Sequence, residues 1–130
     1  MNQQLAHIAL LVADYDEAIT FYTQKLHFIL LEDTVLSDTK RWVIIKPNGQ
    51  NNTGILLAKA ATEAQQKFVG NQAGGRVFLF LYTDNAERDY QNCITQKITI
   101  IKKPSIEPYG KVFVFADLYG NLWDVIEQNI

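Results

Sequence analysis

The chain has 130 residues, of which 48% are hydrophobic, and its formal net charge at pH 7 is -2. This length favours one domain with a single core and is short for two independent domains. The small negative charge argues against sequence-independent binding of nucleic acid. No apolar run reaches the roughly 18–20 residues that span a bilayer. We therefore expect neither nucleic acid nor a membrane as a partner.

The first half of the chain predicts one helix and four strands. Residues 5–13 are apolar almost throughout, as in a strand that is covered on both faces. Asp14 is placed to start a helix, whose apolar residues recur at helical spacing and predict a core-facing stripe: Ala18, Phe21, Tyr22 and Leu26. Further strands are predicted at residues 27–36, 40–46 and 53–59, with Ser37-Asp38-Thr39 as a hairpin turn and a polar loop at 47–52.

The second half predicts the same order of elements. Residues 60–75 read as a connector, with a helix-like segment at 60–69 followed by glycines. A strand at 76–83, a helix at 85–96 and strands near 97–102, 110–116 and 122–127 follow. Pro104 and Pro108 are expected to bracket an irregular loop, because proline cannot donate to a strand ladder.

An internal repeat supports this division. Residues 7–14 (HIALLVAD) are answered 70 positions later by residues 77–84 (VFLFLYTD), and each run ends in an aspartate that precedes a helix-like stretch. We therefore predict an α+β fold built from tandem βαβββ modules. The modules cover about residues 1–59 and 76–130 within a single domain of residues 1–130, and Asp14, Asp84 and Asp117 are expected to be structural, as helix starts and a turn-former.

Two stretches of the chain carry a family pattern. One is residues 7–14 with the helix after it, and the other is Asp117-Leu118-Tyr119-Gly120-Asn121 followed by Asp124. In both, the chain resembles the vicinal oxygen chelate (VOC) superfamily, the glyoxalase and bleomycin-resistance fold. The resemblance implies that each four-stranded sheet curls into a half-barrel and that the pair encloses a cavity, often completed in a homodimer. It does not imply a reaction, since the fold hosts lyases, dioxygenases and non-catalytic drug-binding proteins.

The metal-dependent members of that superfamily imply four ligand positions, on the first and last strand of each module. In this chain they map onto His7, Leu57, Val77 and Asp124, with Leu56 as the alternative to Leu57. Leucine and valine have no donor atoms, so His7 and Asp124 remain as metal ligands if a metal is bound. An extradiol dioxygenase needs two histidines and a carboxylate, and His27 lies away from the mapped positions.

Several side chains are candidates to line a cavity. Aromatic rings offer a large contact area, and strand alternation assigns Trp123 to the core if Asp124 points inward. Arg41 could bind an anionic group, and Glu107 could transfer a proton from the loop that contains Tyr109. The predicted ligand-binding residues are His7, Arg41, Trp42, Tyr82, Glu107, Tyr109 and Asp124, with Glu107 as the candidate catalytic residue.

Three functions are compatible with these residues. The first is a protein that binds a small molecule in a half-barrel cavity without the complete family metal site and without a known cofactor. The alternative is a divalent-metal-dependent lyase or isomerase of the glyoxalase type, which would use His7 and Asp124 with Glu107 as base or extra ligand. The third is a structural or regulatory module that acts through its dimer surface.

Cysteine usage indicates a compartment. Cys93 is the only cysteine, so no intrachain disulfide can form, and a reducing cytoplasm is the expected location. Cys93 lies in a helix-like segment without residues nearby in sequence that would activate it, so we expect a packed, unreactive thiol.

Overall fold

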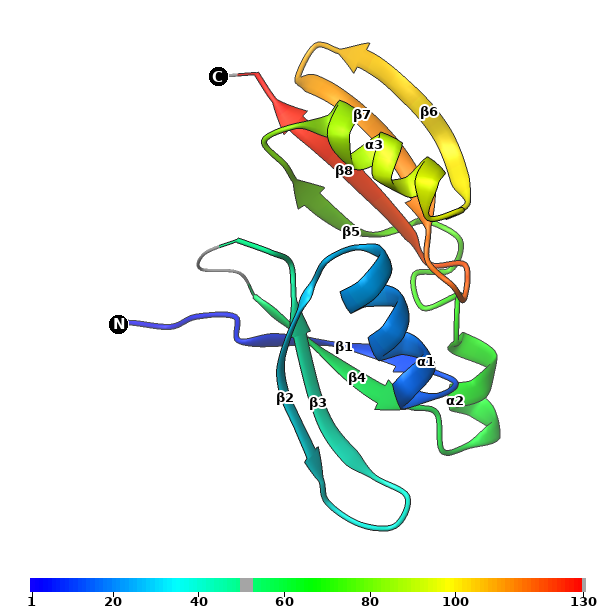
Figure 1. The fold of residues 1–130 in the computed structure, drawn as a ribbon. Coiled ribbons are helices and arrows are strands. Elements are labelled where there is room, and N and C mark those ends of the chain that lie inside the picture. The colour runs from blue at the N-terminus through cyan, green and yellow to red at the C-terminus, as the bar shows by residue number, and fades with distance from the viewer. Residues whose placement is uncertain (50–52, 130) are drawn as a thin grey trace. The chain divides into compact units, whose positions relative to one another are not determined.

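The computed structural model describes residues 1–49 and 53–129 and divides into two units, residues 1–69 and residues 70–130. Each unit holds one four-stranded sheet with a helix packed on one face (Figure 1). The predicted polar loop at 47–52 falls partly on residues 50–52, which lie outside the described residues.

The first unit follows the predicted βαβββ order. Its elements are β1 (His7–Val12), α1 (Tyr15–Thr20), the π-helical η1 (Phe21–Lys25), β2 (Ile29–Val35), β3 (Arg41–Lys46), β4 (Gly54–Lys59) and α2 (Glu63–Phe68). The strand order is β1-β4-β3-β2, with β1 parallel to β4 and the other pairs antiparallel. Ser37-Asp38-Thr39 forms the predicted turn between β2 and β3.

The second unit repeats this plan. Its elements are β5 (Val77–Tyr82), α3 (Ala86–Thr95), β6 (Ile100–Glu107), β7 (Gly110–Ala116) and β8 (Leu122–Gln128). The strand order β5-β8-β7-β6 is that of the first unit, and β5 is again parallel to β8. The prediction of tandem βαβββ modules in an α+β fold is therefore confirmed, and the two sheets are half-barrel-like.

Strand alternation gives each sheet a covered face and an open face. In the first unit the covered face carries Leu10, Val43 and Leu57, all completely buried, and α1 contacts β3 and β4. In the second unit Phe115 and Trp123 stack on the covered face with ring centroids 6.0 Å apart. Trp123 is 2% exposed, so its predicted place in the core is confirmed.

The two main helices begin with side-chain caps. Asp14 accepts a hydrogen bond from the Glu17 backbone amide at 2.8 Å, as predicted for a helix start. In the second unit the cap is Asn85, which accepts from the Arg88 amide at 3.0 Å. The prediction for Asp84 was therefore wrong by one residue: Asp84 instead forms an ion pair with Arg88 at 2.7 Å.

Both helices end on a residue with left-handed backbone geometry. His27 has φ 62° and Lys97 has φ 58°, and these are the non-glycine residues with positive φ in the described chain. They lie 70 positions apart, at the same point of the repeat. The distance from cap to left-handed residue is 13 positions after Asp14 but 12 after Asn85, and the π turn of η1 absorbs the additional residue.

The prediction of an irregular loop between Pro104 and Pro108 was wrong. Strand β6 begins at Ile100 instead of residue 97 and continues through Pro104 to Glu107. The proline is tolerated because β6 is an edge strand and its register with β7 shifts between Lys102 and Ser105. Glu107 pairs with Gly110, so Pro108 and Tyr109 form a tight hairpin turn.

Two further structural predictions are confirmed. Asp117 is 5% exposed and accepts hydrogen bonds from the backbone amides of Tyr119 and Asn121, which makes it the turn-former. Cys93 is 1% exposed, and burial raises the pKa of its thiol to about 12, with a smaller contribution from the charge of Asp89. Within the described residues, no helix is long and apolar enough to cross a membrane.

Candidate functional site

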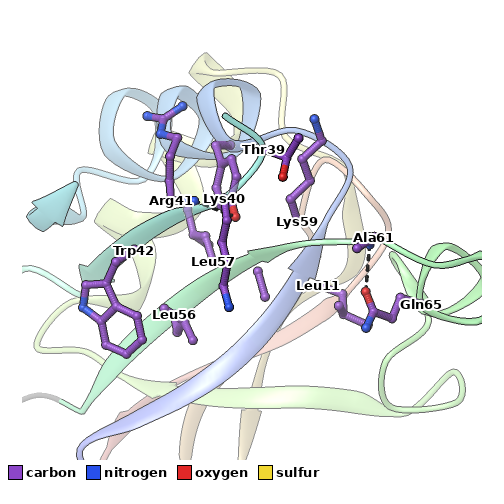
Figure 2. A pocket seen from close by; sticks show the side chains of 13 residues that line it. Leu11, Thr39, Lys40, Arg41, Trp42, Leu56, Leu57, Lys59, Ala61 and Gln65 are labelled. Atoms are coloured by element: carbon purple, nitrogen blue, oxygen red, sulfur yellow. Dashed lines mark hydrogen bonds between the residues drawn. The ribbon is translucent and has the colours of Figure 1, made fainter. Parts of the chain in front are cut away.

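A pocket of about 690 Å³ lies in the first unit, at the end of the sheet where β1 and β4 finish and β3 begins (Figure 2). It is lined by residues of β1, β3 and β4, of the turn before β3, of the start of α1, and of α2 with the segment that leads into it. The lining residues are Leu11, Tyr15, Thr39, Lys40, Arg41, Trp42, Leu56, Leu57, Ala58, Lys59, Ala60, Ala61 and Gln65.

The apolar wall of the pocket belongs to the open face of the sheet. Leu11 pairs with Ala58, and Leu56 lies on the same face, opposite Ile44 of β3. Trp42 shares this face because it is two residues from Ile44 along β3. Its side chain is 37% exposed, so the largest ring of the unit is presented to a ligand without being fixed in the core.

Arg41 is adjacent to Trp42 in sequence and therefore projects to the opposite face. Its guanidinium binds Asp33 through two hydrogen bonds, of 3.1 and 2.6 Å, and Asp16 through a third of 2.9 Å. It also lies 5.1 Å from the centroid of the Tyr15 ring. The hydrogen bonds to Asp33 and then Asp16 raise the pKa of Arg41, and they use its charge within the protein.

His7 is on the open face at the start of β1. Its ring meets the Trp42 ring edge to face, with centroids 6.3 Å apart. Gly54 is its partner on β4, and a Cβ atom there would lie 2.5 Å from His7 Nδ1. The glycine thus leaves room for the imidazole against the sheet.

The first unit does not fit a metal ion. The register places Leu56 on the face of His7, whereas Leu57 faces the helix, so our choice of Leu57 for that position was wrong. Neither residue has a donor atom. Within either unit, the described residues bring no three His, Cys, Asp or Glu side chains together.

The second unit places Asp124 and Tyr82 on its open face. Asp124 pairs with Phe80 of β5, and Tyr82 lies two residues further along that strand. Phe80 and Tyr82 are 64% and 66% exposed. Oδ1 of Asp124 is buried and has no hydrogen-bond partner among the described residues, and this desolvation raises the pKa of the carboxyl, against an opposing effect from Lys102.

Glu107 is the last residue of β6, and Tyr109 lies in the hairpin turn between β6 and β7. The Glu107 carboxylate accepts hydrogen bonds from Ser105 at 3.0 Å and from Lys102 at 3.3 Å. These partners, Ser105 first, lower the pKa of Glu107. A carboxylate stabilised in its charged form is a weaker base, which makes Glu107 poorly matched to proton abstraction near neutral pH.

The structure thus groups the predicted site residues by unit. His7 and Trp42 share the open face of the first sheet with the pocket, Arg41 projects from the other face, and the remaining candidates lie in the second unit. Sequence reasoning missed Lys40, Leu11 and Gln65. Lys40 directly precedes β3 and lies two residues before Trp42, so the alternation of that strand, extended by one residue, indicates it, whereas Gln65 carries no such signal.

The model of the Glyoxalase/Bleomycin resistance protein/Dioxygenase superfamily matches residues 4–125. An uncharacterized protein of Shewanella frigidimarina (strain NCIMB 400) is 52% identical over 130 residues, covering 99% of this chain and 96% of that protein.

Two solved structures are also similar. The crystal structure of UcmS2 has a TM-score of 0.86 and 26% identity, covering 98% of this chain and 100% of that chain. That of TnmS3, an antibiotic-binding protein from Streptomyces sp. CB03234, has a TM-score of 0.78 and 22% identity, covering 98% of each chain. The likeness to TnmS3 shows a common fold.

Proposed function

This chain belongs to the Glyoxalase/Bleomycin resistance protein/Dioxygenase superfamily, and we propose that it binds a small, largely apolar organic molecule in the pocket of its first unit. The observation that carries the proposal is an open-face wall of Leu11, Trp42 and Leu56 around a volume of about 690 Å³. Small-molecule sites have this size range and combine apolar walls with a few polar groups. The antibiotic-binding function of TnmS3, which has the same fold, supports it.

The metal-dependent lyase or isomerase has less support. It requires donors beside His7, and the sheet offers Gly54, Leu56 and Ile44 there. It also requires a base, and Glu107 is held in its charged form by Ser105 and Lys102.

A fluorescence titration tests the binding proposal. N-phenyl-1-naphthylamine is a neutral aromatic probe whose emission rises in apolar surroundings. We expect saturable binding with one site per chain, and Trp42→Ala should weaken it about tenfold, a change of ~1.4 kcal/mol.

Phe68→Ala is the control, because Phe68 is 52% exposed in the same unit but does not line the pocket. It should leave the affinity unchanged. Absence of saturable binding, or equal affinity in wild type and Trp42→Ala, would contradict the proposal. Thermal unfolding of each variant checks that its fold is retained.

We further propose that the protein acts in the cytoplasm as a homodimer. The single cysteine, with its buried unreactive thiol, suits a reducing compartment, and the family resemblance supports the dimer. Light scattering on the purified protein tests the second part: a dimer has twice the chain mass of 14.8 kDa, and a mass of 14.8 kDa at all concentrations would contradict it.

A further inference from the structure

The charged side chains that line the pocket of the first unit are all basic. Its lining includes Lys40, Arg41 and Lys59, and no aspartate or glutamate among the described residues. This imbalance is local, since the chain as a whole carries a net charge of -2. A pocket that is basic in an acidic protein selects the charge of its ligand.

The three cations differ in availability. Asp33 and Asp16 neutralise Arg41, whose side chain leaves the pocket on the covered face of the sheet. Neither Lys40 nor Lys59 has an acidic partner within 4.0 Å among the described residues. A free ammonium group beside an apolar wall can therefore bind an anion without first breaking an internal ion pair.

The side chains of Lys40 and Lys59 point in different directions. Lys40 is two residues before Trp42 and so shares its face. Figure 2 shows Lys40 and Arg41 extending in opposite directions, with Lys40 toward the side that carries Leu56. Lys59 pairs with Val12, whose side chain is buried on the covered face, so its ammonium lies at the rim.

The side-chain amide of Gln65, a neutral group at the pocket, also favours a ligand with hydrogen-bond acceptors. Oε1 of Gln65 accepts a hydrogen bond from the Ala61 amide at 2.7 Å, which is drawn in Figure 2. Its remaining Nε2 group can only donate. Gln65 and the lysines therefore all offer hydrogen-bond donors, which pair with acceptor atoms on a ligand.

We infer that the ligand is an aromatic organic anion, with a flat apolar body against Trp42 and Leu56 and an acidic group bound by the Lys40 ammonium. This inference rests on the proposed function and narrows it to a ligand class. Carboxylate, sulfonate and phenolate share the required chemistry, a negative charge on oxygen acceptors beside a ring.

A pair of probes isolates the acidic group. 1-Anilinonaphthalene-8-sulfonate has the rings of N-phenyl-1-naphthylamine plus a sulfonate. Wild type should bind the sulfonate about fivefold more tightly at low ionic strength. This preference should shrink in 0.5 M NaCl, where screening acts over roughly 3–10 Å.

Lys40→Gln should remove the preference while leaving the neutral probe within about twofold of wild type. The matched control is Lys46→Gln: Lys46 lies on the same face of β3 but outside the pocket, with its ammonium bound to the Gly49 carbonyl at 3.0 Å. It should leave both affinities unchanged.

The outcomes distinguish this inference from the proposed function. If Trp42→Ala weakens both probes but Lys40→Gln keeps the preference, the inference is wrong and the pocket proposal stands. Equal affinity of wild type for both probes, or equal loss in Lys40→Gln and Lys46→Gln, also overturns it. If Trp42→Ala weakens neither probe, the proposed function itself fails.

Discussion

The two units share a strand order and a helix position but present different chemistry on their open faces. The first unit offers a recessed apolar wall with two lysines, Lys40 and Lys59, that have no acidic partner within the described part of the chain. The second offers two exposed rings, Phe80 and Tyr82, and a carboxylate, Asp124, near a lysine that is paired with Glu107. Their covered faces, by contrast, are both filled by buried apolar side chains.

This contrast separates scaffold from site. The interior of the covered face must exclude water, so apolar residues of suitable volume fill it in both units, while the charged Arg41 and Lys59 lie at strand ends. The open faces also bury some apolar side chains, among them Ile44, Val112 and Ile126, but their exposed residues are free to differ. Function in this chain is therefore expected to follow residues on the open faces, and stability to follow those on the covered faces.

The largest expected effect on the free energy of unfolding comes from comparing two tryptophans, one on a covered face and one on an open face. Trp123→Ala should lower the free energy of unfolding by about 3–5 kcal/mol, because it removes a ring that is 2% exposed and stacked on Phe115. Trp42→Ala should cost less than about 1 kcal/mol, because the ring is already partly in water. Urea unfolding measures both, and equal costs would contradict the separation.

The turn at residues 117–121, between β7 and β8 of the second unit, gives the next largest expected loss of stability. Asp117→Ala should cost about 2–4 kcal/mol, because it leaves the amides of Tyr119 and Asn121 and the Asn121 side chain without their buried acceptor. Asp38→Ala, in an exposed turn of the first unit, is the control and should have little effect. A small loss for Asp117→Ala would show that water replaces the carboxylate.

The helix caps should show that the units behave alike where their scaffold is alike. Asp14→Ala and Asn85→Ala should each cost about 1 kcal/mol, because each cap satisfies one backbone amide. Asp84→Ala should cost less than Asn85→Ala, since it breaks only an exposed ion pair. If thermal or urea unfolding shows a larger loss of stability for Asp84→Ala than for Asn85→Ala, Asp84 is the helix cap.

The smallest expected effect concerns pH. The folded-state pKa of Asp124 is raised above its ordinary value of 3.8, so the folded protein holds that proton more tightly than the unfolded chain. Its contribution to stability therefore falls as pH rises from 3.8 to the raised value. Asp124→Asn should lose this component, so the variant should gain on wild type as pH rises through that window.

Urea unfolding from pH 3 to pH 7 measures the difference between the two proteins at each pH. Asp38→Asn, at an exposed position, should show no such trend. A constant difference between wild type and Asp124→Asn across the series would mean that Asp124 is solvated like an ordinary carboxyl.

Much of the scaffold could be predicted from the sequence, because it depends on periodicity within single elements. The repeat at 70 positions indicated two modules of the same order, and alternation from Asp124 placed Trp123 in the core. The same alternation should have separated Arg41 from Trp42, which are neighbours and therefore face opposite ways.

The rest depended on pairing between strands. Leu56 and Leu57 can be told apart only by the register with β1, which turns and loops set at a distance. Pro104 was misjudged because tolerance of a proline depends on whether the strand lies at an edge. Gln65 reaches the pocket from α2, a helix whose packing against β1 leaves no trace in local sequence.

The π turn at Phe21–Lys25 marks where the first helix, counted from its cap to its left-handed residue, is one residue longer than the second. A π turn holds one residue more than the α-helical path needs, so it is the position at which a deletion can be absorbed. Removing Thr23, which is half-buried and whose hydroxyl donates a hydrogen bond to the Ile19 carbonyl of its own helix, should convert the turn to α-helix and leave His27 at its left-handed position. Length variation among relatives is thus expected in this turn, while the strands on either side keep their register.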